Sequence, residues 1–398
     1  MFALFSMLLT LQDLIMIPAL LLGLVFLLPA WWLWQKGQRA WAFLPLFTFL
    51  VVVGFTMAIQ LDIKNHRQTL ADLDVLLAEL NRPDLWLATD LTNPDGHLFL
   101  ASTGSQALYR ARDIAPERQS AIDSTLYLLA DWVAKRENLR QWRRNTNWDR
   151  EVYFLAHVGT TLGHYQLATK DLTFERSLKS VGDHLGKRLE RGRYKHLPSR
   201  PEEDFYRPAD NAAALYALSL YDQAYGSSYA ARNFNDWADY LRDELYYAES
   251  RLPCAAFSST SRCQLDPSAV ATGLYIAYRA AARPEAVNSD IPWREWLHYF
   301  GKTSFSPFSM SIRPNMRDDQ ATRFCDQGSY PLQCNRYEGA VGLWAAAEYG
   351  GTYSYFRLYA THALRRWFVT PINYAGMSAG NRVKALTGVA IRGMATGK

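Results

Sequence analysis

Two uninterrupted apolar runs open the chain, at residues 14–34 and 40–60, and neither contains a charged residue. Each run has the ~20 apolar residues that a helix needs to cross the hydrocarbon layer of a membrane. The pattern predicts a membrane anchor with two transmembrane helices in residues 1–65. A secretory signal peptide is the alternative for the first run, but no basic segment precedes it and a second run follows at once.

The pattern changes to helical periodicity from about residue 66 onward. In residues 116–137, for example, Ile122, Leu126 and Leu129 fall on one helix face. No convincing alternation typical of strands is present, so we expect roughly ten to twelve helices joined by short loops. Similar apolar stripes recur in residues 148–169, 171–190, 208–225, 230–247, 267–282, 337–349, 353–369 and 382–395.

Small residues followed by tyrosines begin several of these helices, as in residues 211–226 and 268–282. Aromatic residues make up 14% of the chain, which is more than core packing requires. Consecutive antiparallel helical hairpins can close into an (α/α)6 barrel, whose inner helices direct their N-terminal loops and aromatic rims toward one central cleft. We therefore predict an all-α fold, with an (α/α)6 barrel as the catalytic domain in residues 66–398. An open solenoid is the alternative, but no fixed repeat period supports it.

The basic residues of the anchor indicate its orientation. Lys36 and Arg39 are the first basic residues of the chain, and they lie between the two apolar runs. Basic loops stay in the cytoplasm, so the chain is expected to be a multi-pass protein of the inner membrane whose soluble part faces the periplasm. Lys64 and Arg67, directly after the second run, point the other way.

Four cysteines form two local pairs, Cys254 with Cys263 and Cys325 with Cys334. An even number of cysteines in polar, loop-like segments predicts two disulfides and an oxidising compartment, in agreement with the orientation. A zinc site is the alternative, but the pairs lack the usual spacing of zinc ligands and have no histidine nearby. We expect no metal.

Charge adds little to this picture. The net charge is +5, with acidic and basic residues interspersed, and the most basic stretches are residues 135–144 and 187–195. Such stretches are typical of solvated helix ends or of a face near anionic lipid headgroups. No nucleic-acid-binding motif accompanies them, so nucleic acid is not an expected partner.

Two histidines and a tyrosine form the first candidate site. His157 and His164 are seven residues apart in a predicted helix, hence on one face, and Tyr153 precedes them by one turn. A histidine within a helix is, in the simplest interpretation, a core residue whose hydrogen bonds are satisfied.

Acidic residues form two more candidates. Glu203, Tyr206 and Asp210 lie in an acidic segment that leads into a helix, and Asp210 would also suit an N-cap, where an oxygen accepts a backbone hydrogen bond. Glu338 begins a later helix beside Tyr337, where the helix dipole would stabilise it. A solvated acidic loop remains the alternative for the first segment.

No nucleophile elbow, phosphate-binding loop, dinucleotide fingerprint or metalloprotease motif occurs in the chain. By elimination, the residues favour an acid/base enzyme that uses no organic cofactor and no metal, with an aromatic pocket as its site.

The soluble part resembles the linalool dehydratase/isomerase family in residues 157–169 and 210–245, and more weakly in residues 337–351. The resemblance implies an (α/α)6 barrel, and the family's catalytic histidine falls on His157. The two active-site cysteines of the family's dehydratase fall on Pro201 and Asp210, so an acid replaces one thiol and a proline the other.

Other features follow from the same resemblance. Tyr109 and Asp113 are loose candidates for an early catalytic pair of the family. The two apolar runs match its membrane-anchored branch, and self-association is implied as well. The implied substrate is a small lipophilic alcohol, which suits an enzyme tethered to lipid.

The implied reaction moves a hydroxyl along an allyl unit, as between linalool and geraniol, with dehydration as a further outcome. It needs a protonated acid, a proton acceptor and walls that tolerate a cation. Burial would favour the protonated form of Asp210, and His157 could relay the proton. Aromatic faces would stabilise an allylic cation.

Two other functions stay open. A glycan-active hydrolase, lyase or epimerase would use Glu203 or Asp210 with Glu338 as its acid and base, in an open groove with several carboxylates. A non-catalytic module of an envelope complex would tolerate substitution of Asp210 and His157.

Overall fold

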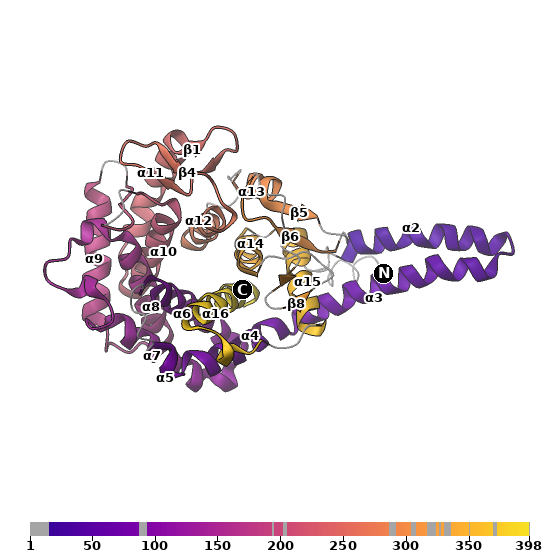
Figure 1. Cartoon of the computed structure of the whole chain (residues 1–398), viewed down its shortest axis with the longest axis horizontal. Coiled ribbons are helices and arrows are strands. Elements are labelled where there is room, and N and C mark those ends of the chain that lie inside the picture. The colour runs from indigo at the N-terminus through magenta and orange to yellow at the C-terminus, as the bar shows by residue number, and fades with distance from the viewer. Residues whose placement is uncertain are drawn as a thin grey trace.

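The computed structural model describes residues 16–86, 94–192, 195–201, 205–285, 292–303, 308–316, 324–325, 328–329, 336–349, 351–368 and 372–397. A hairpin of α2 (Met16–Gln35) and α3 (Arg39–Lys64) projects from a mostly helical body (Figure 1). Gly37 closes the turn between them with φ of +73°, a conformation that residues with a Cβ rarely adopt.

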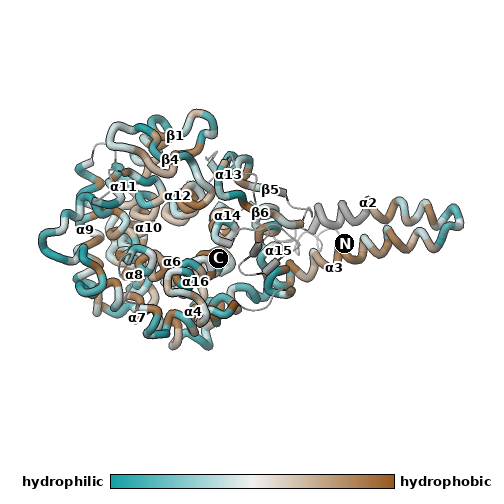
Figure 2. Tube along the Cα trace, viewed as in Figure 1, coloured by the Kyte–Doolittle hydropathy of each residue, from teal (hydrophilic) through white to brown (hydrophobic). Residues whose placement is uncertain are grey.

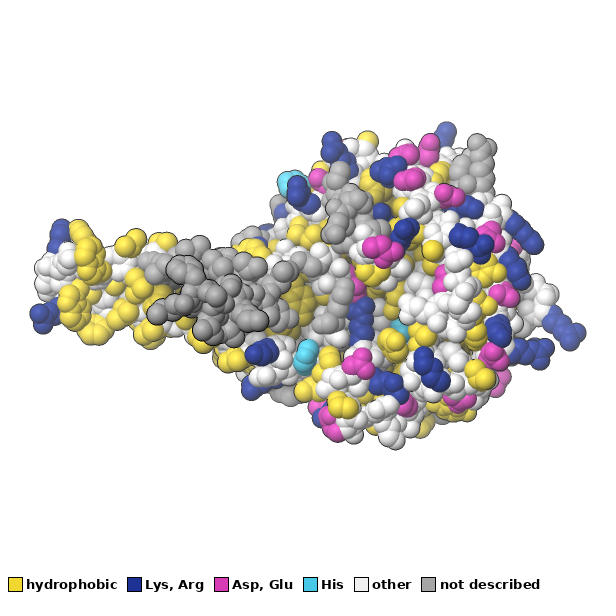
Figure 3. Space-filling model, turned by 180° about the vertical axis from the view of Figure 1, so that it is seen from behind, with side chains coloured by type: hydrophobic (Ala, Val, Ile, Leu, Met, Phe, Trp, Pro, Cys, Tyr) yellow, Lys and Arg dark blue, Asp and Glu magenta, His cyan; other side chains and the backbone are white. Residues whose placement is uncertain are grey.

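The hairpin carries its apolar side chains on the outside. Trp31, Phe43 and Phe47 are all more than half exposed, and the coloured parts of the two helices are largely brown in Figure 2. Figure 3 shows the same surface from behind, with charged side chains spread over the body instead. Within the described part of the chain, Arg39–Lys64 is the one helix found long and apolar enough to cross a membrane.

Six helices of the body pack in a circuit. They are α6 (Asp95–Ile114), α8 (Val152–Thr169), α10 (Pro208–Tyr225), α12 (Ala269–Ala282), α14 (Arg336–Glu348) and α16 (Ala379–Thr396). Each packs against the next, and α16 packs against α6, so the contacts return to the first helix (Figure 1). α8 and α10 are buried on nearly every face, as expected for helices that are apolar or small all round.

A second set of helices covers this circuit from outside: α4 (Arg67–Leu80), α7 (Gln119–Ala134), α9 (Glu175–Arg191), α11 (Tyr229–Glu244), α13 (Pro292–Phe300) and α15 (Thr352–Phe368). Each contacts at least one inner helix. α9 shows why they stay outside, because it buries an apolar stripe that includes Leu178 and Leu185 and exposes its charged residues. The short α5 (Pro83–Trp86) and several 3-10 turns connect the helices.

Within the residues that the structure describes, four small sheets of two strands each were not predicted from the sequence. They pair β1 (Tyr246–Tyr247) with β2 (Leu252–Pro253), β3 (Ala256–Phe257) with β4 (Cys263–Leu265), β5 (Gly301–Thr303) with β6 (Met310–Ile312), and β7 (Phe324–Cys325) with β8 (Gly328–Ser329). All are antiparallel hairpins. Strands of two or three residues are too short to produce a recognisable alternation.

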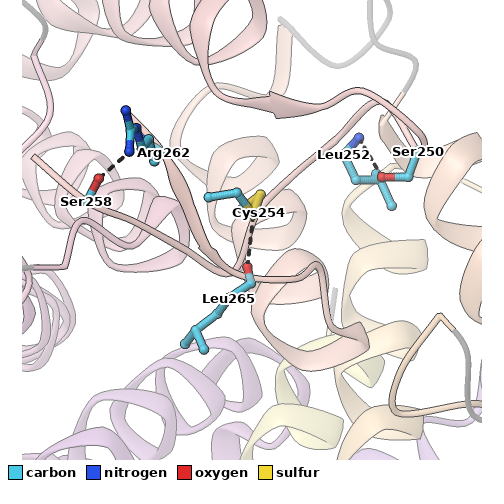
Figure 4. Close-up of a disulfide and its surroundings, with 7 residues drawn as sticks. Ser250, Leu252, Cys254, Ser258, Arg262 and Leu265 are labelled. Carbon is cyan, nitrogen blue, oxygen red and sulfur yellow. Dashed lines mark hydrogen bonds between the residues drawn. A yellow bond between two sulfur atoms is a disulfide. The ribbon is translucent and has the colours of Figure 1, made fainter. Parts of the chain in front are cut away.

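One disulfide joins Cys254 to Cys263 across the β3–β4 hairpin, with the two Cα atoms 5.8 Å apart (Figure 4). The hairpin is also attached to the body, because Tyr206 and Phe257 exchange two backbone hydrogen bonds of 2.9 Å. The predicted pairing of Cys325 with Cys334 lies outside the described side chains.

Candidate active site

A cavity of about 250 Å³ lies at the N-terminal ends of four consecutive inner helices, α6, α8, α10 and α12. It brings together His157 and Asp210, which are 53 positions apart in the sequence. Its other lining residues are Phe99, Tyr153, Arg200, Arg207, Ala209, Ala255, Ser268, Val270, Ala271, Leu274 and Tyr278.

Asp210 enters the cavity from the first turn of α10. The helix begins with Pro208 at its first position, where a missing N–H costs nothing, and Arg207 is the N-cap. Asp210 is therefore not the N-cap that its sequence context suggested, and its side chain is buried in the wall of the cavity, with the residue 8% exposed.

His157 lies in the second turn of α8 and is 1% exposed. Its Nδ1 is 3.0 Å from the hydroxyl oxygen of Ser102 on α6, and the rings of Phe99 and Tyr153 meet its ring edge-on at 5.0 and 4.5 Å. Burial, aided by the positive charge of Arg200, lowers the pKa of His157 to about 3. The imidazole is thus neutral near pH 7, so one ring nitrogen carries a hydrogen and the other is an acceptor.

Hydrogen bonds of the segment before Arg200 fix its place at the cavity. The Asn211 side chain accepts from the backbone N–H of Leu197 at 2.8 Å and donates to its carbonyl at 3.0 Å. The backbone N–H of Tyr153 donates to the carbonyl of Ser199, which fixes the same segment to the start of α8. Arg200 follows directly in the chain.

The Arg200 guanidinium therefore has a defined position. Its carbon lies 4.4 Å from the centre of the Tyr153 ring, in a cation–π contact, and its Nε forms an ion pair of 2.8 Å with Asp95. The Tyr153 hydroxyl donates to the Asp95 carbonyl at 2.8 Å. Burial is the main cause that raises the pKa of Tyr153, so the phenol stays protonated.

The disulfide hairpin supplies another wall of the cavity. Ala255 lies between Cys254 and the β3 strand, and it lines the cavity. Ser268 caps α12 by accepting from the N–H of Ala271 at 3.3 Å, which places the start of that helix at the cavity as well. The Cys254–Cys263 disulfide thus closes a loop that forms part of the candidate site.

His164 and Tyr109 come together at a different place, deeper along α8. His164 is fully buried, with its Nδ1 3.1 Å from Ser105 and its Nε2 3.0 Å from Tyr216, and the Tyr109 ring stacks on it at 5.2 Å. Burial is the main cause that lowers its pKa to about 3. With both nitrogens bonded to protein, His164 has the geometry of a core residue.

The remaining sequence candidates are dispersed. Asp113 is exposed near the end of α6, and Tyr206 is half-buried in the bridge to the disulfide hairpin, so neither lines the cavity. Tyr337 and Glu338 begin α14, and burial raises the pKa of both side chains. Tyr337 lies close enough to Tyr153 to affect its titration. Glu203 lies outside the described residues.

Several cavity residues were missed in the sequence. Arg200 and Arg207 flank the acidic residues of the segment that leads into α10. Tyr278 lies in α12, whose sequence is rich in small residues and tyrosines. Phe99 also lines the cavity from α6, and Ser102 on the same helix contacts His157 without lining the cavity. Consecutive small polar residues in α6 could have indicated a buried polar helix. Among the described residues no cluster of histidine, cysteine, aspartate or glutamate is arranged to hold a metal ion.

No family model and no curated protein matches the chain.

Proposed function

We propose that the protein is a cofactor-independent isomerase of a small allylic alcohol, of the linalool–geraniol class, with loss of water as a further outcome. The single observation that carries the proposal is the shared cavity of Asp210 and His157, an acid and a neutral acceptor between aromatic walls. In this proposal the circuit of six inner and six outer helices is an (α/α)6 barrel, anchored by α2 and α3 in the inner membrane, with the body in the periplasm.

The size of the cavity supports a small substrate. An apolar cavity of ~150 Å³ binds benzene, so about 250 Å³ accommodates roughly ten non-hydrogen atoms. A monoterpene alcohol has about eleven, and ligand sites bury most of the ligand's surface. A polysaccharide would need a longer groove, and a glycosidase would need two carboxylates across the bond, whereas Asp210 is the one carboxylate found among the described lining residues.

The proposed reaction conserves all atoms. Asp210 donates a proton to the substrate hydroxyl, and the C–O bond then breaks. Water departs, and an allylic cation and the Asp210 carboxylate remain. Water then adds to the far end of the allyl unit, and its spare proton returns to Asp210 directly or through the neutral His157. The cation would be stabilised by the aromatic rings that line the cavity, those of Phe99, Tyr153 and Tyr278. Each desolvated ring contributes up to ~2 kcal/mol of cation–π stabilisation.

One specific observation favours a second candidate. Arg200 and Arg207 line the same cavity, and the N-terminal ends of the inner helices add positive potential there. A small anion, such as the uronate end of an oligosaccharide, would gain from this potential, whereas a cation would not. In this candidate the arginines bind the carboxylate, and Asp210 acts as the acid or base of a hydrolase, lyase or epimerase.

The test is incubation of the purified full chain with linalool and with geraniol, followed by gas chromatography of the extract. Because general acid catalysis contributes about 10²–10⁴-fold, Asp210→Asn should lower the rate by at least roughly 10²-fold. Asp113→Asn, which changes an exposed carboxylate on α6, is the matched control and should leave the rate unchanged. Folded protein that interconverts neither alcohol, yet acts on a uronate-ended oligosaccharide, would establish the second candidate instead.

A further inference from the structure

The tip of the α2–α3 hairpin marks one boundary of the membrane that the hairpin is proposed to cross. Lys36 Nζ lies 3.9 Å from the centre of the Trp32 ring, and the Arg39 guanidinium carbon lies 5.4 Å from the centre of the Trp34 ring. Both tryptophans are about half exposed. Exposed tryptophans beside basic residues are typical of a membrane–water interface, so the hydrocarbon layer should begin just after Arg39.

The length of α3 gives the other boundary. A hydrocarbon layer ~30 Å thick takes ~20 residues at ~1.5 Å each, so a helix that enters it after Arg39 leaves it at about residue 60. α3 continues to Lys64, and Asp62 therefore lies just beyond the boundary. A tilt of the helix would shorten its projected length and move the boundary further along α3.

The body already covers α3 before this boundary is reached. Thr56, Ile59 and Asp62 are buried, and the rings of Phe55 and Phe308 meet edge-on with their centres 5.9 Å apart. Thr56 precedes residue 60 by about one helical turn, which is ~6 Å along the axis. The body therefore extends at least to the bilayer surface beside α3, without a spacer between them.

The end of α15 lies beside α3 at the level of this boundary (Figure 1). Asp62 accepts a hydrogen bond of 2.6 Å from the Tyr359 hydroxyl and forms an ion pair with Arg366, and both partners are on α15. Trp367 and Phe368 then end the helix, with 38% and 76% of each residue exposed. Among the large apolar side chains that the structure describes, none is more exposed than Phe368.

We propose that the end of α15 is a lipid-contacting surface, at which Trp367 and Phe368 insert into the interface of the leaflet nearest the body. Aromatic side chains are favoured at that depth, and burial of their apolar area offsets the cost of exposing them in water. The surface continues the exposed apolar face of the hairpin, which is why lipid is assigned as its occupant. The proposal rests on the membrane anchor of the proposed function and on no residue of the candidate active site.

The test attaches a fluorescent label to single introduced cysteines of the full chain, reconstituted into phosphatidylcholine vesicles. Phe368→Cys reports the end of α15, and Trp367→Cys reports the same place if the first variant fails to fold. Leu50→Cys, at an exposed position midway along the expected crossing, reports the bilayer centre. Leu172→Cys, at an exposed position just before α9 on the side of the body away from the hairpin, is the matched control (Figure 1). The unchanged chain treated with the same dye gives the background of the native cysteines.

Two spin-labelled lipids serve as quenchers, one with its nitroxide just below the headgroup and one with it at the end of the acyl chain. The label of Phe368→Cys should lose at least half as much emission to the shallow lipid as the label of Leu50→Cys loses to the deep one. It should also respond less to the deep lipid than to the shallow lipid, because an interfacial side chain stays near the headgroups. The label of Leu172→Cys should respond to neither lipid and should be quenched by iodide in the water.

The outcomes separate this proposal from the anchor on which it rests. If lipid quenches the label of Leu50→Cys but iodide alone quenches that of Phe368→Cys, the hairpin crosses the membrane and the lipid-contacting surface is overturned. If neither lipid nor iodide reaches the label of Phe368→Cys, protein covers the end of α15, and lipid is overturned as its occupant. If lipid fails to quench the label of Leu50→Cys, the anchor itself fails, and the surface with it. None of these results depends on isomerase activity.

Discussion

Acidification should destabilise this protein strongly, because the fold lowers the pKa of four of its eight histidines and so disfavours their charged form. Burial is the largest cause that lowers the pKa to about 3 in His157, His164, His196 and His362. In the unfolded chain a histidine has a pKa near 6.5, so between pH 6.5 and 3 the unfolded state binds more protons than the folded state. Stability must therefore fall as the pH drops through that window.

The size of the effect follows from the same values. Each buried histidine loses ~1.4 kcal/mol of stability for each pH unit below 6.5, hence about 2 kcal/mol at pH 5 and on the order of 8 kcal/mol for four. That loss compares with ~5–15 kcal/mol for the whole stability of a typical domain. Glu151 offsets part of it, because burial is the main cause that raises its pKa to about 7, and the folded state gains its proton first.

The assay is urea denaturation of the full chain in detergent at pH 7.5 and pH 5.0, followed by tryptophan fluorescence. His196→Asn isolates one contribution, since the asparagine oxygen can still accept the 3.1 Å hydrogen bond from Trp237. The variant should recover about 2 kcal/mol of the difference between the two pH values. His298→Asn, at an exposed position on α13, should leave that difference unchanged.

A free energy of unfolding that is the same at both pH values would refute the reasoning. It would mean that the buried histidines are hydrated or charged in the folded protein. A drop of the expected size that His196→Asn does not reduce would be a different failure, because it would place the acid sensitivity in other groups.

Three further effects are expected. Gly182→Ala should cost about 1–3 kcal/mol in chemical denaturation, because the added methyl would overlap a tyrosine ring of α10. Reduction of the Cys254–Cys263 disulfide should cost roughly 2–3 kcal/mol and weaken substrate binding, read as a raised KM, since the loop forms a cavity wall. Ser102→Ala should cost about 1–3 kcal/mol of stability in chemical denaturation, because the buried His157 nitrogen loses its partner.

Local patterns in the sequence predicted most of the helices because helix formation depends on neighbours three and four residues away. The helix predicted for residues 208–225 has those bounds in α10, and the one for residues 171–190 is close to α9. The prediction for residues 382–395 falls within α16. The return of α16 to α6 is different, because it joins residues nearly 300 positions apart and leaves no local trace.

The candidate site was predictable in part for the same reason. The sequence pattern of their own helices identified Asp210 and His157 as candidates. Arg200 is positioned instead by hydrogen bonds from Asn211 and Tyr153 to the connecting segment that precedes it. Such a connection is tertiary and carries no periodicity. Asp113 shows the opposite error, since a chemically suitable residue near the end of a helix can simply face solvent.

The burial that gives His157 its proposed role is also what should make the fold sensitive to acid. An imidazole with a pKa of about 3 remains a neutral acceptor throughout the neutral range, so its own titration cannot set an acid limit on catalysis. We expect that limit to come from unfolding. The same ring binds a proton more readily in the unfolded state, so acid shifts the equilibrium toward the unfolded chain. Activity and stability should therefore be lost together on acidification, at a pH well above the pKa of the folded residue, because the loss reports the equilibrium between folded and unfolded chains.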